Sequence, residues 1–178
     1  MDRICIPIAL QVCFDDIGWD NGANLYHKGQ ATRTGIPRYH TYEDYEAVHL
    51  LGKGIGQRIV TPLCLADWDK DDLLRGEVGI THDPDGWNRA AEINVKEFER
   101  YAALMDSSDS FDITIHGLLH GCYDENGKML HEHEFFHTKA SVPGIEKDGP
   151  IPKWDFDRRM ELFFKIYKSW AYYNWRIF

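Results

Sequence analysis

The sequence predicts an α/β domain built around a parallel sheet. Apolar segments at residues 4–14, 58–66 and 111–115 are typical of buried strands, and segments with helical spacing of apolar residues alternate with them. Such alternation favours parallel strands joined by right-handed helical connections. The chain has 178 residues, of which 43% are hydrophobic, so we expect one well-buried domain over residues 1–178.

A long loop and a helix are predicted between the first two strands. Residues 18–40 contain several glycines together with scattered aromatic and basic side chains, which is typical of a loop. Thr41 then begins a capping signature, because an acid, Asp44, follows three residues later. The helix presents apolar side chains at helical spacing and is expected to end at Gly54 and Gly56.

Two further helices are predicted after the second and third strands. Asn94 is the expected N-cap of a helix over residues 95–105, whose apolar side chains share one face. The last helix is predicted from about Asp155 to Tyr172. Between the second strand and the Asn94 helix, residues 78–81 are predicted to form a weak strand.

Charge and composition exclude several classes of protein. The formal net charge is −9, and no lysine and arginine cluster of the kind that binds nucleic acid is present, so we expect no nucleic-acid partner. The four cysteines lack CxxC spacing and mostly lie in apolar runs, as small buried hydrophobic residues do. The N-terminal apolar run is too short to span a bilayer and lacks the features of a signal peptide. We therefore expect no membrane association and, by default, a cytoplasmic protein.

All three predicted strands end in side chains that can bind a metal or move a proton. In chain order these groups are Asp15-Asp16, Asp67-Trp68-Asp69, and His116 with His120. In parallel α/β folds the reactive groups gather at the C-terminal ends of the strands. Two adjacent carboxylates near a core also repel each other, and a cation is the simplest compensation.

The two histidines have a spacing that suits a metal site. Residues four apart that leave a strand into a tight turn can face the same way. Two imidazoles and one carboxylate would leave coordination positions for water and substrate, while the neighbouring carboxylate could serve as a base. The alternatives are that His116 and His120 are ordinary surface or core residues, and that Asp15-Asp16 only caps a helix or forms a turn.

Two segments resemble motifs of the polysaccharide deacetylase (NodB-homology) superfamily. Phe14-Asp15-Asp16 is similar to its T/S-F-D-D motif, and His116-Gly117-Leu118-Leu119-His120 is similar to its H-S/T-x-x-H motif. The resemblance implies a distorted (β/α) barrel that hydrolyses N- or O-acetyl groups on a carbohydrate substrate. It also implies that Asp16, His116 and His120 hold a divalent metal, usually zinc. Asp15 would then be the general base that takes a proton from the metal-bound water.

The chain departs from the family pattern at several points. Cys13 and Gly117 stand where the family usually has Thr or Ser; Gly117 removes a hydroxyl but permits closer approach of the backbone. After His137 no histidine follows that could act as the late general acid of the family. A full barrel takes about 200–250 residues, so we expect a partial barrel that lacks its C-terminal part. A homo-oligomer could cover the exposed sheet edge and the aromatic C-terminus.

Substrate contacts are predicted near the strand ends and in the polar segment 131–137. Aromatic rings mixed with hydrogen-bonding groups suit a sugar-binding wall. The residues chosen on this basis are Trp19, Asp67, Trp68 and Glu134. The alternatives are ordered surface loops and, for segment 131–137, a second metal site. The acceptors that orient the two imidazoles are left open among Asp67, Asp69 and Asp124.

Two other functions remain open at this stage. Without the late histidine, the protein could be a catalytically silent relative that binds a saccharide or a partner protein. Paired carboxylates such as Asp15 and Asp67 could also serve a glycoside hydrolase. Only the metal-dependent hydrolase is expected to lose activity with a chelator and to recover it with added zinc.

Overall fold

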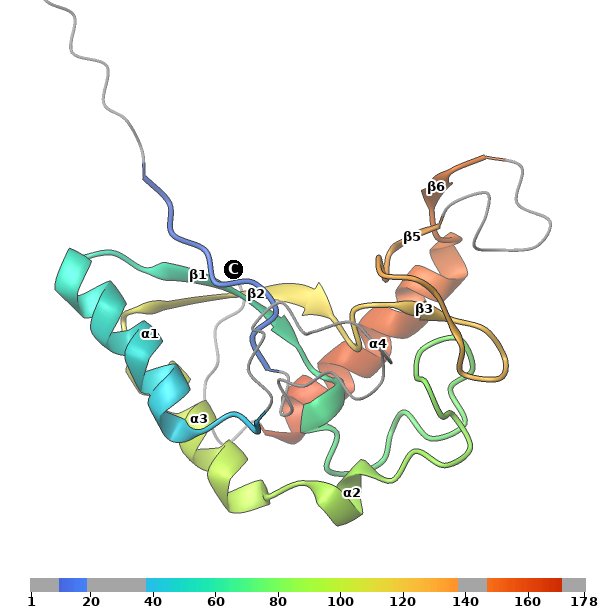
Figure 1. Ribbon diagram of the computed structural model, residues 1–178, viewed down its shortest axis with the longest axis horizontal. Coiled ribbons are helices and arrows are strands. Elements are labelled where there is room, and N and C mark those ends of the chain that lie inside the picture. The colour runs from blue at the N-terminus through green and yellow to red at the C-terminus, as the bar shows by residue number, and fades with distance from the viewer. Residues whose placement is uncertain (1–9, 19–37, 138–146, 171–178) are drawn as a thin grey trace, which may run out of the picture.

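The computed structural model describes residues 10–18, 38–137 and 147–170, which form helices, a small parallel sheet and short antiparallel strand pairs (Figure 1). The elements are α1 (Tyr42–Ile55), β1 (Ile59–Cys64), the 3₁₀ helix η1 (Ala66–Trp68), α2 (Arg89–Glu92), α3 (Val95–Ser107), β2 (Phe111–Gly117), β3 (Cys122–Tyr123), β4 (Met129–His131), β5 (Phe136–His137), β6 (Gly149–Pro150) and α4 (Lys153–Ser169). The predicted helices at 95–105 and near 155–172 correspond to α3 and α4, although Tyr172 lies outside the described residues.

The central sheet is parallel, as the alternation predicts. β1 pairs with β2 from Ile59 opposite Phe111 to the ends of both strands, and α3 lies in the connection between them. The N-terminal segment lies along the other edge of β1, to which it forms isolated parallel bridges at Cys13 and Ile17. The order across the sheet is therefore N-terminal segment, β1, β2. This arrangement brings the C-terminal ends of all three to one edge.

The helix boundaries follow local signals in the sequence. At the start of α1, the backbone N–H of Thr41 donates to the Asp44 carboxylate at 2.9 Å, and Gly56 ends the helix with a left-handed φ of 66°. At the start of α3, the Asn94 side chain accepts a hydrogen bond from the backbone N–H of Glu97. These observations confirm the predicted N-caps of both helices.

Trp68 occupies the centre of the hydrophobic core. Its ring is fully buried and makes edge contacts with Phe98 of α3 and Trp170 at the end of α4, at centroid distances of 4.8 and 5.5 Å. The indole N–H of Trp68 donates to the carbonyl of Gly18, and the indole N–H of Trp170 donates to the carbonyl of Trp68. Tyr45 and Tyr101 stack between α1 and α3. The core therefore joins the N-terminal segment to three helices.

Some expectations are corrected. The weak strand predicted at residues 78–81 is a series of turns. Over residues 10–18, 38–137 and 147–170 the sheet is small and does not close into the expected barrel, and the pairs β3–β4 and β5–β6 are separate antiparallel ribbons. In the same ranges no helix combines the length and apolar character needed to cross a membrane. The predicted strand at residues 4–14 lies mostly outside the described part of the chain.

Candidate metal centre

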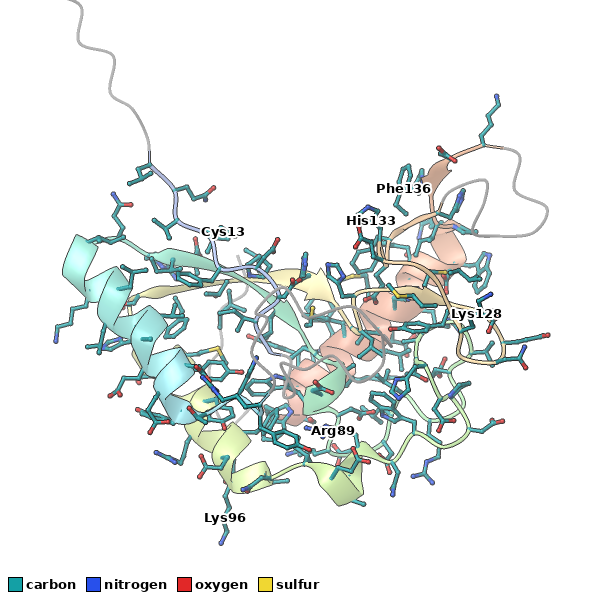
Figure 2. All side chains as sticks on the ribbon, in the orientation of Figure 1. Cys13, Arg89, Lys96, Lys128, His133 and Phe136 are labelled. Atoms are coloured by element: carbon teal, nitrogen blue, oxygen red, sulfur yellow. The ribbon has the colours of Figure 1, made fainter. Side chains whose placement is uncertain are left out.

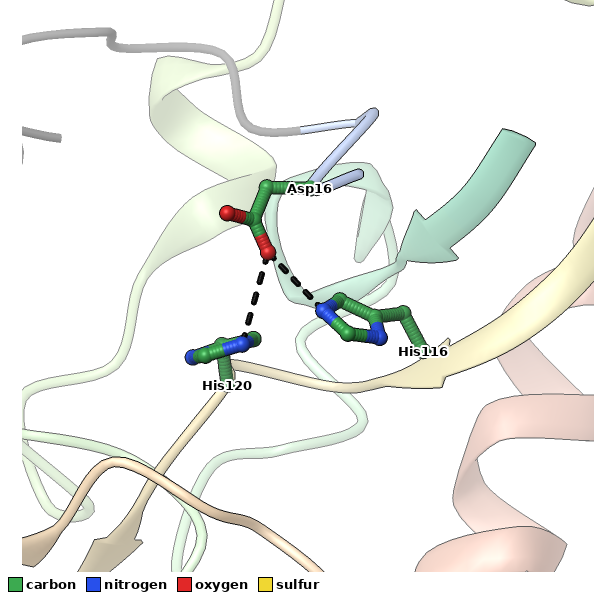
Figure 3. Close-up of side chains that lie close together, drawn as sticks. All are labelled: Asp16, His116 and His120. Atoms are coloured by element: carbon green, nitrogen blue, oxygen red, sulfur yellow. Dashed lines mark hydrogen bonds and ion pairs between the residues drawn. The ribbon is translucent and has the colours of Figure 1, made fainter. Parts of the chain in front are cut away.

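Asp16, His116 and His120 converge at the C-terminal edge of the sheet. Asp16 Oδ1 lies 2.9 Å from His116 Nε2 and 3.4 Å from His120 Nε2 (Figure 3). One ligand atom from each of the three residues lies within 4.8 Å of the other two. Asp16 and His120 are buried and His116 is partly buried. The predicted convergence of the first and third strand ends is therefore confirmed.

The parallel register explains how residues 100 positions apart meet. Ile17 bridges Leu63 in β1, and Leu63 is paired with Ile115 in β2. Asp16 therefore lies one residue before this level and His116 one residue after it, on either side of β1 and near its C-terminal end. This proximity depends on parallel pairing, because an antiparallel partner would place the two residues at opposite ends of the sheet.

The backbone is strained at two of these three residues. Asp16 has a φ of 59° and His120 a φ of 49°. Left-handed backbone costs a residue other than glycine roughly 1–2 kcal/mol, and such conformations concentrate at active sites and ligand clamps. Asp16 lies between Cys13 and Ile17, the two residues that form bridges to β1. Figure 3 shows that the resulting side chains point toward one another.

The donor set fits a divalent metal ion. Tetrahedral ligands at about 2.0–2.2 Å from an ion lie about 3.3 Å from one another. The contacts from Asp16 Oδ1 to the two imidazole nitrogens, 2.9 and 3.4 Å, are close to that spacing. Two imidazoles and one carboxylate bind several divalent transition metals, so the donor atoms alone do not identify zinc. Asp16, His116 and His120 thus form a group that can hold a metal ion.

Asp15 differs from its neighbour in exposure. Its side chain is 50% exposed, whereas that of Asp16 is 1% exposed, and Asp15 Oδ1 lies 3.6 Å from His116 Nε2. Asp15 therefore faces solvent, whereas Asp16 is buried. The pair divides into one buried and one accessible carboxylate.

The loop that carries His120 surrounds the carboxylate of Glu134. Glu134 Oε2 accepts hydrogen bonds from the backbone N–H groups of three consecutive residues, at distances of 2.7, 3.1 and 3.1 Å. These residues are Leu118, Leu119 and His120. Glu134 is buried, and its Oε2 atom is held by the backbone of the loop. Its position is that of an internal contact of the loop that carries His120, and the structure does not support the predicted contact with substrate.

Arg159 of α4 faces the other oxygen of Glu134. Its guanidinium lies 3.5 Å from Glu134 Oε1, and both side chains are 1% exposed. Arg159 also donates to the carboxylate of Asp155 at 3.1 Å and to the carbonyl of Gly79 at 2.8 Å. Burial raises the pKa of Glu134, whereas Arg159 and the three backbone N–H groups lower it.

Two other predicted substrate contacts are buried structural residues. Trp68 lies in the core, and Asp67 is 2% exposed, with its backbone carbonyl accepting a hydrogen bond from Arg89 at 2.8 Å. Both side chains are buried, so the structure does not support the predicted substrate contact at Asp67 or Trp68. Asp69 accepts the indole N–H of Trp87, and Asp124 accepts backbone N–H groups of a turn; within the described residues neither forms a hydrogen bond to His116 or His120. Trp19 lies outside the described residues.

An apolar pocket of about 430 Å³ adjoins the two aspartates. It lies between the N-terminal segment and α1, and its lining includes Phe14, Asp15, Asp16, Ile17, Tyr45, Val48 and Leu51. Arg38 also lines it and forms two hydrogen bonds of 2.7 Å to the carboxylate of Asp44. The Arg38 hydrogen bonds lower the pKa of Asp44 to about 2.

The functional residues predicted from the sequence do not include Arg159, although its spacing from apolar residues indicates that it is buried. Arg159 precedes Leu162, Phe163 and Ile166 by three, four and seven residues, so helical spacing places it on the buried face of α4. A buried arginine requires a carboxylate partner.

Comparison of the chain with models of protein families, with curated proteins and with solved structures finds no match. The proposals below therefore rest on residues of this chain.

Proposed function

We propose that the protein is a metal-dependent hydrolase, similar to carbohydrate deacetylases, which removes N- or O-acetyl groups from a saccharide. The observation that supports this most strongly is the contact of Asp16 Oδ1 with both His116 Nε2 and His120 Nε2. We propose zinc as the metal, because imidazole and carboxylate ligands with open positions are typical of catalytic zinc sites. The similarity of both motifs to the deacetylase superfamily supports the choice of reaction.

The proposed reaction needs both activated water and a polarised carbonyl. Amide and ester carbonyls resist attack by neutral water at pH 7. A divalent cation in this site would lower the pKa of a coordinated water toward about 7 and polarise the carbonyl of the substrate. Asp16, His116 and His120 supply the ligands, and their burial limits competition from bulk water.

Asp15 is the general base in this proposal. Its carboxylate is accessible to solvent and lies 3.6 Å from His116 Nε2, so it can reach a water molecule beside the ligands. Asp16 is unsuited to that role because both imidazoles contact its Oδ1 atom. The proton removed from the attacking water would therefore be held on Asp15.

The neighbouring pocket offers room for part of the substrate. Asp15 and Asp16 lie at its wall, and most of its remaining lining is apolar. Binding sites for small molecules are commonly concave and apolar with a few polar groups that fix orientation. The acetyl group or an apolar sugar face would suit this surface. The glycoside hydrolase alternative has less support, because Asp67 is buried against Arg89.

The proposal is tested by metal content together with acetate release. Purified wild-type protein is expected to hold one zinc per chain and to release acetate from acetylated oligosaccharides. A chelator should abolish activity and added zinc should restore it. His116→Ala and His120→Ala should both lose the zinc, whereas the control variant His133→Ala, which removes a half-exposed histidine of a nearby loop, should retain it.

The outcomes separate the open alternatives. Unchanged zinc content in both histidine variants would contradict the metal site. Stoichiometric zinc without acetate release from any acetylated saccharide would contradict the deacetylase assignment and favour a silent binding protein. Activity that survives complete removal of metal would contradict the metal-dependent mechanism.

A further inference from the structure

We propose that Glu134 is a positioning residue that fixes the His116–His120 loop in the geometry of the metal site, and that Arg159 holds Glu134 in place. The metal-binding part of this inference rests on the proposed function, whereas the loop-fixing part concerns contacts within the chain. Glu134 is separated from His120 by 14 positions and lies in a different segment. It reaches the metal site only through the backbone of the loop.

The hydrogen bonds of Glu134 specify the shape of the loop. Three consecutive backbone N–H groups converge on Glu134 Oε2, and the last of them belongs to His120. In an ordinary strand, successive N–H groups point to opposite sides, so this convergence requires a tight turn. His120 has a φ of 49° within that turn. A carboxylate oxygen beneath the loop therefore supports the strained conformation that directs the His120 imidazole toward Asp16.

Gly117 makes this arrangement sterically possible. Its φ is 136°, and a β-carbon at this position would lie 2.3 Å from Glu134 Oε2. Any other residue would therefore collide with the carboxylate and adopt an unfavourable backbone conformation. The related deacetylase motif has Ser or Thr at this position. In this chain, Gly117 and Glu134 form a different support for the same histidine loop.

Arg159 provides the countercharge that permits Glu134 to be buried. An isolated buried carboxylate is strongly unfavourable, and a guanidinium at 3.5 Å and three backbone donors offset part of this cost for Glu134, whose pKa is still raised by burial. Arg159 is itself fixed by Asp155 within α4 and by the carbonyl of Gly79. The orientation of the His116–His120 loop is therefore coupled to α4 through the buried ion pair of Glu134 and Arg159.

The neighbouring arginine is a matched control for Arg159. Arg158 contacts the same helix and the same turn, through Asp155 and the carbonyl of Val78, and it also pairs with Glu77. None of these contacts involves Glu134. Removal of Arg158 therefore tests the loss of an arginine from α4 without loss of the support beneath the loop.

The test combines zinc affinity with hydrogen exchange of the loop amides. Zinc dissociation constants are measured by competition with a chromophoric chelator for wild type, Glu134→Gln, Glu134→Ala, Arg159→Met and Arg158→Met. Removing an outer-shell partner typically weakens metal binding about 10–100-fold. We expect that loss in Glu134→Ala and Arg159→Met, a smaller loss in Glu134→Gln, and wild-type affinity in Arg158→Met. Circular dichroism identifies variants that fail to fold.

Hydrogen exchange is measured on the metal-free proteins and needs no activity. The amides of Leu118, Leu119 and His120 are expected to exchange faster in folded Glu134→Gln than in wild type, with unchanged exchange in β1. Wild-type affinity in Glu134→Gln and Glu134→Ala, or unchanged protection of these amides in Glu134→Gln, would overturn the proposal. If Glu134→Ala does not fold, the zinc affinity and amide exchange of Glu134→Gln test the proposal. Absence of zinc binding in wild type would contradict the proposed function instead, and exchange would still decide the role of Glu134.

Discussion

The carboxylate of Asp16 contacts the imidazole of His116 at 2.9 Å across 100 positions of sequence. β1 lies between the two residues in the sheet. Asp16 and His116 come together because the N-terminal segment, β1 and β2 run parallel. His120 joins them from the loop after β2. This convergence gives a reason for an apolar segment to end in two adjacent acids: Asp16 is buried against both imidazoles, and Asp15 faces solvent.

The two aspartates are expected to respond differently to substitution. Asp16→Asn should reduce zinc affinity strongly, because the buried carboxylate contacts both imidazoles. Asp15→Asn should retain zinc but reduce kcat by about 10²–10⁴-fold, as expected for loss of a general base. Zinc titration and acetate-release kinetics measure the two effects. The division of roles would be wrong if Asp15→Asn lost the metal while Asp16→Asn kept it.

Gly117→Ser should damage the site, although it gives position 117 the residue type of the H-S/T-x-x-H motif that this segment resembles. The added side chain would meet Glu134 Oε2, and its β-carbon would lie 2.3 Å from that atom. Overpacking and unfavourable φ together are expected to lower the free energy of unfolding by about 1–3 kcal/mol and to weaken zinc binding. Urea denaturation and zinc titration check this. A Ser variant with wild-type stability and affinity would contradict the proposed support by Gly117 and Glu134.

Trp68→Phe should affect stability and leave substrate recognition unchanged. The substitution removes the indole N–H that donates to the carbonyl of Gly18 in the buried core. Loss of a hydrogen bond to a buried acceptor costs about 1–3 kcal/mol, and the smaller ring adds a cavity. Urea denaturation measures the loss, and KM for an acetylated oligosaccharide is the control. A raised KM with unchanged stability would restore Trp68 as a substrate contact.

The Arg38–Asp44 pair predicts a defined dependence of stability on acid. Its hydrogen bonds lower the pKa of Asp44 from 3.8 to about 2, so the folded state binds the Asp44 proton less readily than the unfolded state. The stabilisation by this pair is therefore present above about pH 4 and is lost as the pH falls toward 2. We expect the difference in unfolding free energy between wild type and Asp44→Asn to stay constant down to pH 4 and to shrink below it.

The size of that difference is expected to be modest. Both side chains are more than one third exposed, and exposed ion pairs contribute at most about 1 kcal/mol. The Asp44 carboxylate also accepts the backbone N–H of Thr41, so its removal affects the start of α1. Chemical denaturation between pH 2 and 7 on metal-free protein measures the effect. A difference that grows as the pH falls would contradict the lowered pKa of Asp44.

The elements with local signals were predictable from the sequence. α1 and α3 each combine an N-cap and an apolar face within one short stretch, α1 is also followed by Gly56, and the two N-caps were placed correctly at Thr41 and Asn94. The parallel pairing of β1 and β2 followed from the intervening helix. The convergence of Asp16, His116 and His120 was also predictable, because strand position and residue type coincide at these three residues.

Features that depend on distant contacts were not predictable. Residues 78–81 contain strand-forming side chains, but the carbonyls of Val78 and Gly79 accept hydrogen bonds from Arg158 and Arg159 of α4, and the segment turns. Glu134 looks like a polar loop residue until the loop backbone after β2 is placed around it. Trp68 follows a strand, as cleft residues often do, but Phe98 of α3 and Trp170 at the end of α4 pack against it. Figure 2 shows the side chains of the described residues on the ribbon.

Anomalous diffraction from a zinc-soaked crystal, recorded at the zinc absorption edge, tests the metal centre most directly. The predicted result is one anomalous peak within about 2.0–2.2 Å of Asp16 Oδ1, His116 Nε2 and His120 Nε2. A crystal that shows no peak at these three atoms, or shows zinc only at other histidines such as His133, would contradict the assignment.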